Sequence, residues 1–240
     1  MRRRFFVDEV RNGSAHIDGE EARHLTRVLR VEAGQRYEIS DNRHVYLAEI
    51  ETARKESVVF RTLEKLPAAP AAARIELYAA LIKFDRFEWI VEKATELGVT
   101  EIVPVEAARS DRGLEKGAAK RVERWRRIAL EASQQSRRTH LPEIEEPVPL
   151  AVALARTGTC RFALDENPDA APLLSALPLA RTAQDTVAIL TGPEGGWTED
   201  ERASFTVAGW TPVSMGPLIL RTETAVIAAL AVVSQAWLVR

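Results

Sequence analysis

Short apolar runs separated by turn residues fill the first third of the chain and predict a β-rich segment. The residues between these runs, such as Asn12, Gly13 and Gly34, are typical of tight turns. One stretch, Gly19–Val31, has apolar side chains at helical spacing instead, and it predicts a single helix. The expected strands are Arg4–Val7, Arg36–Ser40, Val45–Glu49 and Ser57–Leu63. A small β-barrel with one helix fits this pattern.

The rest of the chain alternates between strand-like and helix-like periods. The strand-like runs are Ile75–Ile82, Glu101–Val105, Phe162–Leu164 and Thr186–Thr191. The helix-like stretches are Asp85–Leu97, Lys116–Ser136, Thr198–Thr206 and Thr222–Val239. Strands that alternate with helices predict an α/β fold, with a parallel sheet that carries helices on both faces.

The ends of two expected helices carry recognisable signals. Asp85 can cap the first of them, and Gly98 can close it with a left-handed residue. Thr198, followed by Glu201 three residues later, predicts a capping box at the start of another.

A small, uncharged segment rich in proline and alanine, Leu66–Ala73, separates the two patterns. Such a composition favours a semi-rigid linker. We therefore expect two domains, residues 1–70 and residues 71–240.

Composition limits the classes of function. The chain has 240 residues, 46% of them hydrophobic, which is enough to form a hydrophobic core. Its formal net charge is −2, so a surface that binds nucleic acid must be a local basic patch. The lone Cys160 excludes an internal disulfide and a cysteine-rich zinc site; we expect a core thiol and no metal. No signal-peptide pattern follows the basic start, and no apolar run has membrane-spanning length. We expect a cytoplasmic protein without membrane contact.

A glycine-rich turn follows the strand at Thr186–Thr191. It contains Gly192, Glu194, Gly195 and Gly196, at the strand end where α/β sheets bind ligands. The turn lacks the phosphate-loop lysine and the dinucleotide fingerprint, and Glu194 would repel phosphate. A cationic or neutral ligand suits it, although an ordinary glycine turn has the same sequence.

A second ligand-like segment, Met215–Ala225, opens the last expected helix. Its apolar residues can pack against a flat ring, and Thr222 or Thr224 can cap the helix. Capping together with an ion pair between Arg221 and Glu223 is the alternative interpretation.

Basic residues concentrate in the long helical stretch, where only Glu123 and Glu131 oppose them. They are Lys116, Lys120, Arg121, Arg124, Arg126, Arg127, Arg137 and Arg138. Such a strip suits RNA phosphates, and a solvated helix face is the alternative.

Together these segments resemble the RsmE family of SPOUT methyltransferases, which methylates N3 of a uridine in small-subunit ribosomal RNA. The resemblance covers nearly the whole chain. It rests on the two loops and on Arg4–Val7, His24–Arg30, Lys83–Gly98 and Glu131–Arg137. The chain departs from the family pattern at Leu218, usually arginine, at Arg137, usually glycine, and at Met215, commonly leucine.

The resemblance implies a PUA-like RNA-binding barrel, followed by a SPOUT α/β domain with a trefoil knot. It further implies a homodimer that uses S-adenosylmethionine and acts on 16S rRNA of the small ribosomal subunit. The implied cofactor contacts are Leu164, Gly192, Glu194, Gly195, Gly196, Met215, Gly216, Ile219, Leu220, Thr222, Thr224 and Ala225. The candidate RNA contacts are Arg2, Arg3, Arg4, His24, Arg27, Arg30, Lys83, Arg86, Arg124, Arg127, Gln135, Arg137 and Arg138.

The catalytic candidates are Arg221 and Glu223. The N3 proton must leave during methylation, so a base or a cation that stabilises negative charge on the ring would lower the barrier. Arginine stays protonated and suits the cationic role. Glu223 or Glu194 could accept the proton or orient the ligand.

Three other functions stay open on the residues alone. One is an RNA-binding assembly factor without turnover, which donor binding would distinguish. Another is a nucleotide-dependent enzyme of the ordinary doubly wound type, which the missing phosphate motifs disfavour. The third is a methyltransferase that acts on tRNA or on a different base.

Overall fold

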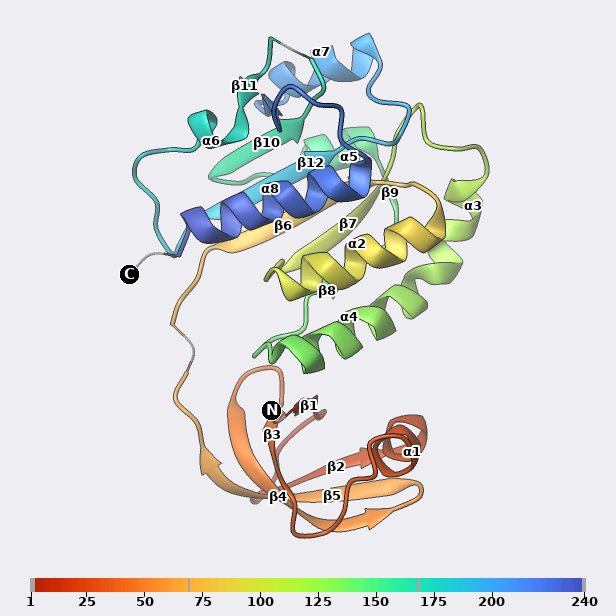
Figure 1. The fold of residues 1–240 in the computed structure, drawn as a ribbon, viewed down its shortest axis with the longest axis vertical. Helices are drawn as coiled ribbons and strands as arrows, with labels where there is room; N and C mark the ends of the chain where they lie inside the picture. The colour runs from red at the N-terminus through yellow and green to blue at the C-terminus, as the bar shows by residue number, and fades with distance from the viewer. Residues whose placement is uncertain (1–2, 69, 168, 239–240) are drawn as a thin grey trace. The chain divides into compact units, whose positions relative to one another are not determined.

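A computed structural model describes residues 3–68, 70–167 and 169–238 (Figure 1). Its internal contacts divide the chain into two compact units. Unit 1 comprises Met1–Pro70 together with Ser133–Leu141, and unit 2 comprises Ala71–Ala132 and Pro142–Arg240. The division falls in the proline- and alanine-rich segment. The inclusion of Ser133–Leu141 in unit 1 was not indicated by any sequence pattern.

Unit 1 is built on a curled five-stranded sheet with the order β1-β3-β4-β5-β2. The β1 and β3 strands are parallel, and the other neighbours are antiparallel. The sheet is open, with β1 and β2 at its two edges. The expected barrel is therefore present as a curled sheet that does not close. The strands are β1 (Arg4–Phe6), β2 (Ser14–Asp18), β3 (Arg36–Ser40), β4 (Val45–Arg54) and β5 (Ser57–Lys65).

The core of unit 1 lies between this sheet and helix α1 (Gly19–Arg27). Leu25 of the helix is fully buried with Phe5, Ile39 and Phe60 of the strands. The α1 helix ends earlier than its sequence pattern indicates. The β2 strand was not predicted, because only Ala15 and Ile17 mark its inner face.

Unit 2 contains an eight-stranded sheet, and every strand pair in it is parallel. The order is β11-β13-β10-β12-β6-β7-β8, with β9 also paired to β7. The strands are β6 (Arg74–Ala80), β7 (Glu101–Glu106), β8 (Glu143–Ile144), β9 (Val148–Pro149), β10 (Cys160–Leu164), β11 (Ala171–Pro172), β12 (Thr186–Thr191) and β13 (Thr211–Ser214). The expected parallel α/β sheet is confirmed, although its four shortest strands were not predicted.

Both faces of this sheet are covered, as the alternation along β12 demonstrates. Val187 and Ile189 belong to one apolar cluster, and Ala188 and Leu190 belong to another. The first cluster includes helices α2 (Phe84–Glu96), α4 (Val122–Ser136) and α8 (Thr222–Ala236), whereas the second includes α5 (Leu150–Leu154) and α7 (Glu199–Val207). Figure 1 shows α2 and α8 crossing the same face of the sheet. A further short helix, α6, spans Leu173–Ala176.

The prediction of one helix over Lys116–Ser136 is confirmed for Val122–Ser136 and was wrong before Val122. The chain forms α3 (Leu114–Ala118), a 3₁₀ turn (Ala119–Arg121) and then α4. Gly117 packs against the Phe84 ring so closely that an added Cβ would lie 3.0 Å from it. This contact depends on the folded chain, and the helical period of the sequence contains no sign of it.

Two of the predicted helix-end residues have the expected role, and others do not. Gly98 has φ +94°, and its N–H donates to the Thr95 carbonyl, as expected. The capping box at Thr198 is also present. Asp85 lies inside the first turn of α2 and does not cap it, and the residue that precedes α8 is Arg221. No helix in the described ranges is long and apolar enough to cross a bilayer.

Candidate cofactor site

Three loops line a cavity of about 440 Å³ at one edge of the unit 2 sheet. They follow β10, β12 and β13, and because these strands are parallel their carboxyl ends meet at the same edge. The lining residues are Leu164, Asp165, Glu166, Thr191, Gly192, Pro193, Glu194, Gly195, Gly196, Trp197, Met215, Gly216, Pro217, Leu218, Ile219, Leu220, Arg221, Thr222 and Ala225.

All of the cofactor contacts implied by the sequence lie in this wall except Thr224, which is exposed on α8. The other α8 threonine, Thr222, is buried, and its hydroxyl donates to the Gly192 carbonyl at 3.2 Å. Since this bond joins the glycine loop to the start of α8, the two loops identified in the sequence form one site.

Sequence reasoning missed Trp197, which joins two walls of the cavity. Its ring is fully buried, and its indole N–H donates to the Leu164 carbonyl at 2.9 Å. A Cβ on Gly192 would lie 3.0 Å from the same ring. A tryptophan directly after a glycine loop was the available signal.

The glycine at position 196 has a backbone conformation that favours glycine. Its φ is +67°, a region that other residues enter at a cost of roughly 1–2 kcal/mol. A Cβ there would lie 2.5 Å from Oε1 of Glu166. A side chain at this position would therefore displace the Glu166 carboxylate, which accepts a hydrogen bond from Arg202.

Arg109, which follows β7, holds the glycine loop from outside. Its Nη1 donates to the carbonyl oxygens of Gly195 at 3.2 Å and of Trp197 at 3.1 Å. The backbone N–H of Ala108 donates to the Glu201 carboxylate at 2.8 Å. Arg109 was not a sequence candidate, because nothing in its local pattern separates it from other loop arginines.

Acidic groups dominate the polar part of the wall. Arg202 bonds Asp165 at 3.1 Å and Glu166 at 2.6 Å. Burial works to lower the pKa of Arg202, but the hydrogen bond and charge of Asp165 outweigh it and raise that pKa. Arg202 therefore remains a cation beside Asp165. The Thr191 hydroxyl is buried without a hydrogen-bond partner among the described residues.

Arg86 lies beside this site, although the sequence suggested it for RNA. Its Nη1 is 3.2 Å from a carboxylate oxygen of Glu194 and 3.9 Å from one of Glu223. The second oxygen of Glu223 is buried and has no hydrogen-bond partner within the described ranges. Of the two catalytic candidates, Arg221 lines the cavity and Glu223 does not.

The candidate RNA contacts of unit 1 differ in exposure. Arg3, His24, Arg27, Arg30 and Gln135 are exposed, whereas Arg2 lies outside the described residues.

Two other candidates of unit 1, Arg4 and Arg137, bind the Glu38 carboxylate. A third, Arg138, donates to the His140 carbonyl, and burial lowers the pKa of Arg138 to about 10.

In unit 2, Lys83 and Arg127 are exposed, and Arg124 binds Glu88 through two hydrogen bonds of 2.6 and 2.8 Å. Part of the basic strip is therefore neutralised within the chain. Cys160 is half-buried, and burial raises the pKa of its thiol. No cluster of three or more metal-ligating side chains occurs among the described residues.

Comparison with known proteins assigns both parts of the chain. Residues 69–234 match the RNA methyltransferase domain family, and residues 17–63 match the RNA methyltransferase PUA domain family.

Similar whole proteins include two named ribosomal RNA small subunit methyltransferase E. The one from Bacillus subtilis is 32% identical over 91% of this chain and 88% of its own length. The one from Aquifex aeolicus is 30% identical over 95% of this chain and 97% of its own length. A crystal structure of the Neisseria gonorrhoeae ribosomal RNA small subunit methyltransferase E bound to S-adenosyl methionine is also similar. Its TM-score is 0.86 with 29% identity, over 99% of this chain and 98% of that one.

Proposed function

This chain belongs to the RNA methyltransferase family, and on that basis we propose that it methylates N3 of a uridine in 16S ribosomal RNA with S-adenosylmethionine as the donor. The observation that carries the proposal is the cavity shared by the glycine loop and the Met215–Ala225 loop. The relatives named above act on small-subunit ribosomal RNA, and one of them has the donor bound.

The residues of the cavity fit the proposed donor. Leu218, Ile219 and Leu220 offer apolar contacts to a flat adenine ring. Glu166 and Glu194 offer carboxylates to a ligand with positively charged sulfonium and ammonium groups. The buried Thr191 hydroxyl at the wall can also hydrogen-bond a polar group of the donor.

When bound, S-adenosylmethionine supplies an electrophilic methyl carbon, so the protein's own task is to position the reactants and manage one proton. The uridine N3 carries a proton that must leave. Arg221, which lines the cavity, is proposed to stabilise the negative charge that develops on the uracil oxygens. Glu223 is proposed to accept the proton or to orient the ligand, and its unpartnered oxygen supports such a polar role.

The RNA is proposed to bind exposed cations of both units, including Arg3, His24, Arg27 and Arg30 of unit 1 and Lys83 and Arg127 of unit 2. In this proposal residues 1–70 form the RNA-binding domain, and residues 71–240 form the methyltransferase domain with a trefoil knot. We further propose that the protein acts as a cytoplasmic homodimer, as the RsmE resemblance implies.

The direct test incubates the protein with methyl-labelled S-adenosylmethionine and small ribosomal subunits from cells that lack it. We expect label in one uridine of 16S RNA, mapped as 3-methyluridine. Donor binding without any transfer to subunits or naked rRNA would favour the RNA-binding assembly factor instead. Label in tRNA or on another base would identify a different methyltransferase.

A further inference from the structure

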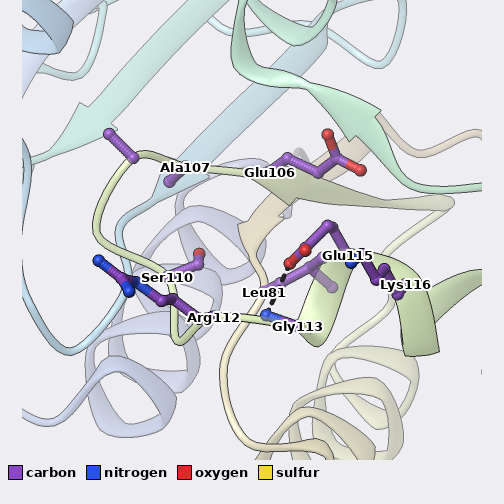
Figure 2. Close-up of a pocket in the computed structure, with 9 residues that line it drawn as sticks. Leu81, Glu106, Ala107, Ser110, Arg112, Gly113, Glu115 and Lys116 are labelled. Atoms are coloured by element: carbon purple, nitrogen blue, oxygen red, sulfur yellow. Dashed lines mark hydrogen bonds between the residues drawn. The ribbon is translucent and has the colours of Figure 1, made fainter.

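A second cavity, of about 640 Å³, lies at the carboxyl ends of β6 and β7 (Figure 2). Leu81 follows β6, and residues 106–116 run from the end of β7 into α3. Because β6, β7 and β12 are parallel neighbours, this cavity opens at the same edge of the sheet as the cofactor site. The proposed function above does not use it.

The loop that lines this second cavity also touches the wall of the cofactor site. Ala108 and Ser110 line the cavity, and Arg109 between them binds the carbonyl oxygens of Gly195 and Trp197. A Cβ on Gly195 would lie 3.0 Å from the Cβ of Arg109, so the two loops are in contact. Residues 108–110 therefore connect the two cavities.

The second cavity offers both hydrogen-bond donors and acceptors. Figure 2 shows the Ser110 hydroxyl and the Glu115 carboxylate facing the hollow from opposite sides, with Arg112 and Lys116 at its margins. Glu115 is held in place because it accepts the Gly113 N–H at 3.0 Å. The Ser110 hydroxyl has no hydrogen-bond partner among the described residues.

This combination suits a uracil ring. A uracil carbonyl oxygen accepts hydrogen bonds, and Ser110 supplies a donor that is otherwise unused. Such a bond would hold the ring through one oxygen and leave N3 open to the methyl donor. Arg112 and Lys116 form no ion pair with any described residue, and their charges suit the phosphates on either side of an extruded nucleotide.

We propose that this second cavity, the acceptor cavity, receives the single extruded uridine that is to be methylated, an inference that rests on the proposed function. A base inside a helix cannot reach a buried reaction centre, so it must leave the stack and enter a pocket beside the donor. The acceptor cavity is such a pocket, and the Arg109 contacts couple its occupancy to the shape of the glycine loop.

A photochemical experiment tests the location without any mutation. A short single-stranded RNA with the target sequence carries one 4-thiouridine at the methylated position, and it is irradiated with the full-length protein and S-adenosylhomocysteine. We expect crosslinks, mapped by mass spectrometry, within residues 106–116. Crosslinks that fall elsewhere, or none above the level of an RNA with a scrambled sequence, would overturn the inference.

A filling mutation tests the same cavity kinetically. The Ala108→Phe variant adds a ring to the acceptor cavity while its backbone N–H can still bind Glu201. We expect kcat/KM for RNA to fall by about tenfold or more, with the dissociation constant of S-adenosylmethionine changed by less than about threefold. The control is Ala151→Phe, at an exposed alanine of α5 that lines neither cavity.

These outcomes separate the inference from the proposed function. If the wild-type protein methylates 16S RNA but Ala108→Phe and Ala151→Phe have equal kcat/KM, the acceptor cavity is wrong and the proposed function stands. If the wild-type protein transfers no methyl group to RNA, the proposed function fails irrespective of the crosslinks. A Ser110→Ala variant adds a finer test, because we expect its KM for RNA to rise while thermal stability is retained.

Discussion

Arg109 and Gly195 are joined by a hydrogen bond of 3.2 Å from the guanidinium to the backbone carbonyl, and a Cβ added to the glycine would lie 3.0 Å from the Cβ of Arg109. The same guanidinium also reaches the Trp197 carbonyl. A side chain from the β7–α3 loop thus holds a loop more than eighty residues away in sequence. This makes Arg109 a positioning residue for the cofactor site.

The first prediction concerns that contact. Replacement of Arg109 by alanine is expected to weaken S-adenosylmethionine binding about tenfold, because charge-assisted hydrogen bonds contribute roughly 1.5–3 kcal/mol each and part of that is recovered from water. Isothermal titration calorimetry measures the change. The Arg43→Ala variant, at an exposed arginine of unit 1, provides the control and is expected to bind the donor normally. Equal affinities for the two variants would contradict the positioning role.

The second prediction separates backbone strain from steric contact. Gly196→Ala is expected to lose roughly 1–3 kcal/mol of unfolding free energy and to bind S-adenosylmethionine poorly, because its Cβ meets Glu166. Gly34 has φ +85° with open space around it, so Gly34→Ala carries strain alone. We expect Gly34→Ala to lose stability in urea titrations and to keep its affinity for the donor. A normal affinity in Gly196→Ala would show that the glycine is not needed by the site.

The third prediction concerns Arg137, the residue that replaces the glycine of the RsmE pattern. It follows α4 with φ +58°, so a non-glycine residue occupies a left-handed conformation. Burial works to raise the pKa of Glu38, but the hydrogen bonds and charges of Arg4 and Arg137 outweigh it and lower that pKa. The Glu38 carboxylate is therefore charged at neutral pH, and its pairing with Arg137 partly offsets the backbone strain.

We expect Arg137→Ala to be less stable than Arg137→Gly by about 1 kcal/mol, since both lose the ion pair but only alanine keeps the strain. Urea denaturation at low and high salt measures both effects. The wild-type protein should lose more stability in high salt than either variant. If the alanine and glycine variants were equally stable, the backbone argument would be wrong.

The fourth prediction assigns Arg221 to catalysis rather than to donor binding. Loss of a charge-stabilising group commonly costs about 10²–10³ in turnover. Arg221→Ala is therefore expected to reduce kcat by about a hundredfold and to change the dissociation constant of S-adenosylmethionine by less than about threefold. Single-turnover methylation measures the rate of methyl transfer, and calorimetry measures the dissociation constant of S-adenosylmethionine. A donor affinity that falls as steeply as the rate would assign Arg221 to the cofactor instead.

The fifth prediction follows from a buried carboxyl group at the start of β7, at the edge of the unit 2 sheet opposite the cofactor site. Glu101 is almost fully buried between Arg74 and Arg156, and burial, together with its hydrogen bond to Glu145, raises the pKa of Glu101 to about 7. A raised folded-state pKa means that protonation stabilises the fold. This contribution is complete below the ordinary value of 4.5 and is lost as pH rises through about 7.

The Tm of the wild-type protein should therefore fall between pH 5 and pH 8 relative to that of Glu101→Gln, which cannot titrate. For a chain of this size about 1 kcal/mol corresponds to roughly 2–4 °C, so differential scanning calorimetry can resolve the effect. If the Tm values of the two proteins changed with pH in the same way, Glu101 would not be the cause of the pH dependence.

Local periodicity predicted the longer elements well. The Thr186–Thr191 strand and the Thr198 capping box depend on neighbours in sequence, and both have the expected bounds or contacts. The two-residue strands such as β8 were missed, because two paired residues create no period. The predicted long helix is interrupted by the 3₁₀ turn at Ala119–Arg121, which the helical period of the sequence does not show.

The candidate site was predictable where residue type alone determines chemistry. Gly196 and Thr222 could be identified because glycine loops and helix starts have characteristic residues, and both lie in the cavity wall. Arg109 and Arg86 could not be assigned to the site, because their contacts with Gly195 and Glu194 depend on the packing of distant segments.

Unit 1 is assembled from two separate stretches of chain, and this has a consequence for its synthesis. Ser40 donates to the Thr139 carbonyl, and the Leu141 N–H donates to the side chain of Asn42. A nascent chain that has emerged only as far as the alanine-rich linker lacks these partners. The first unit to leave the ribosome therefore cannot complete its fold until Leu141 has also emerged.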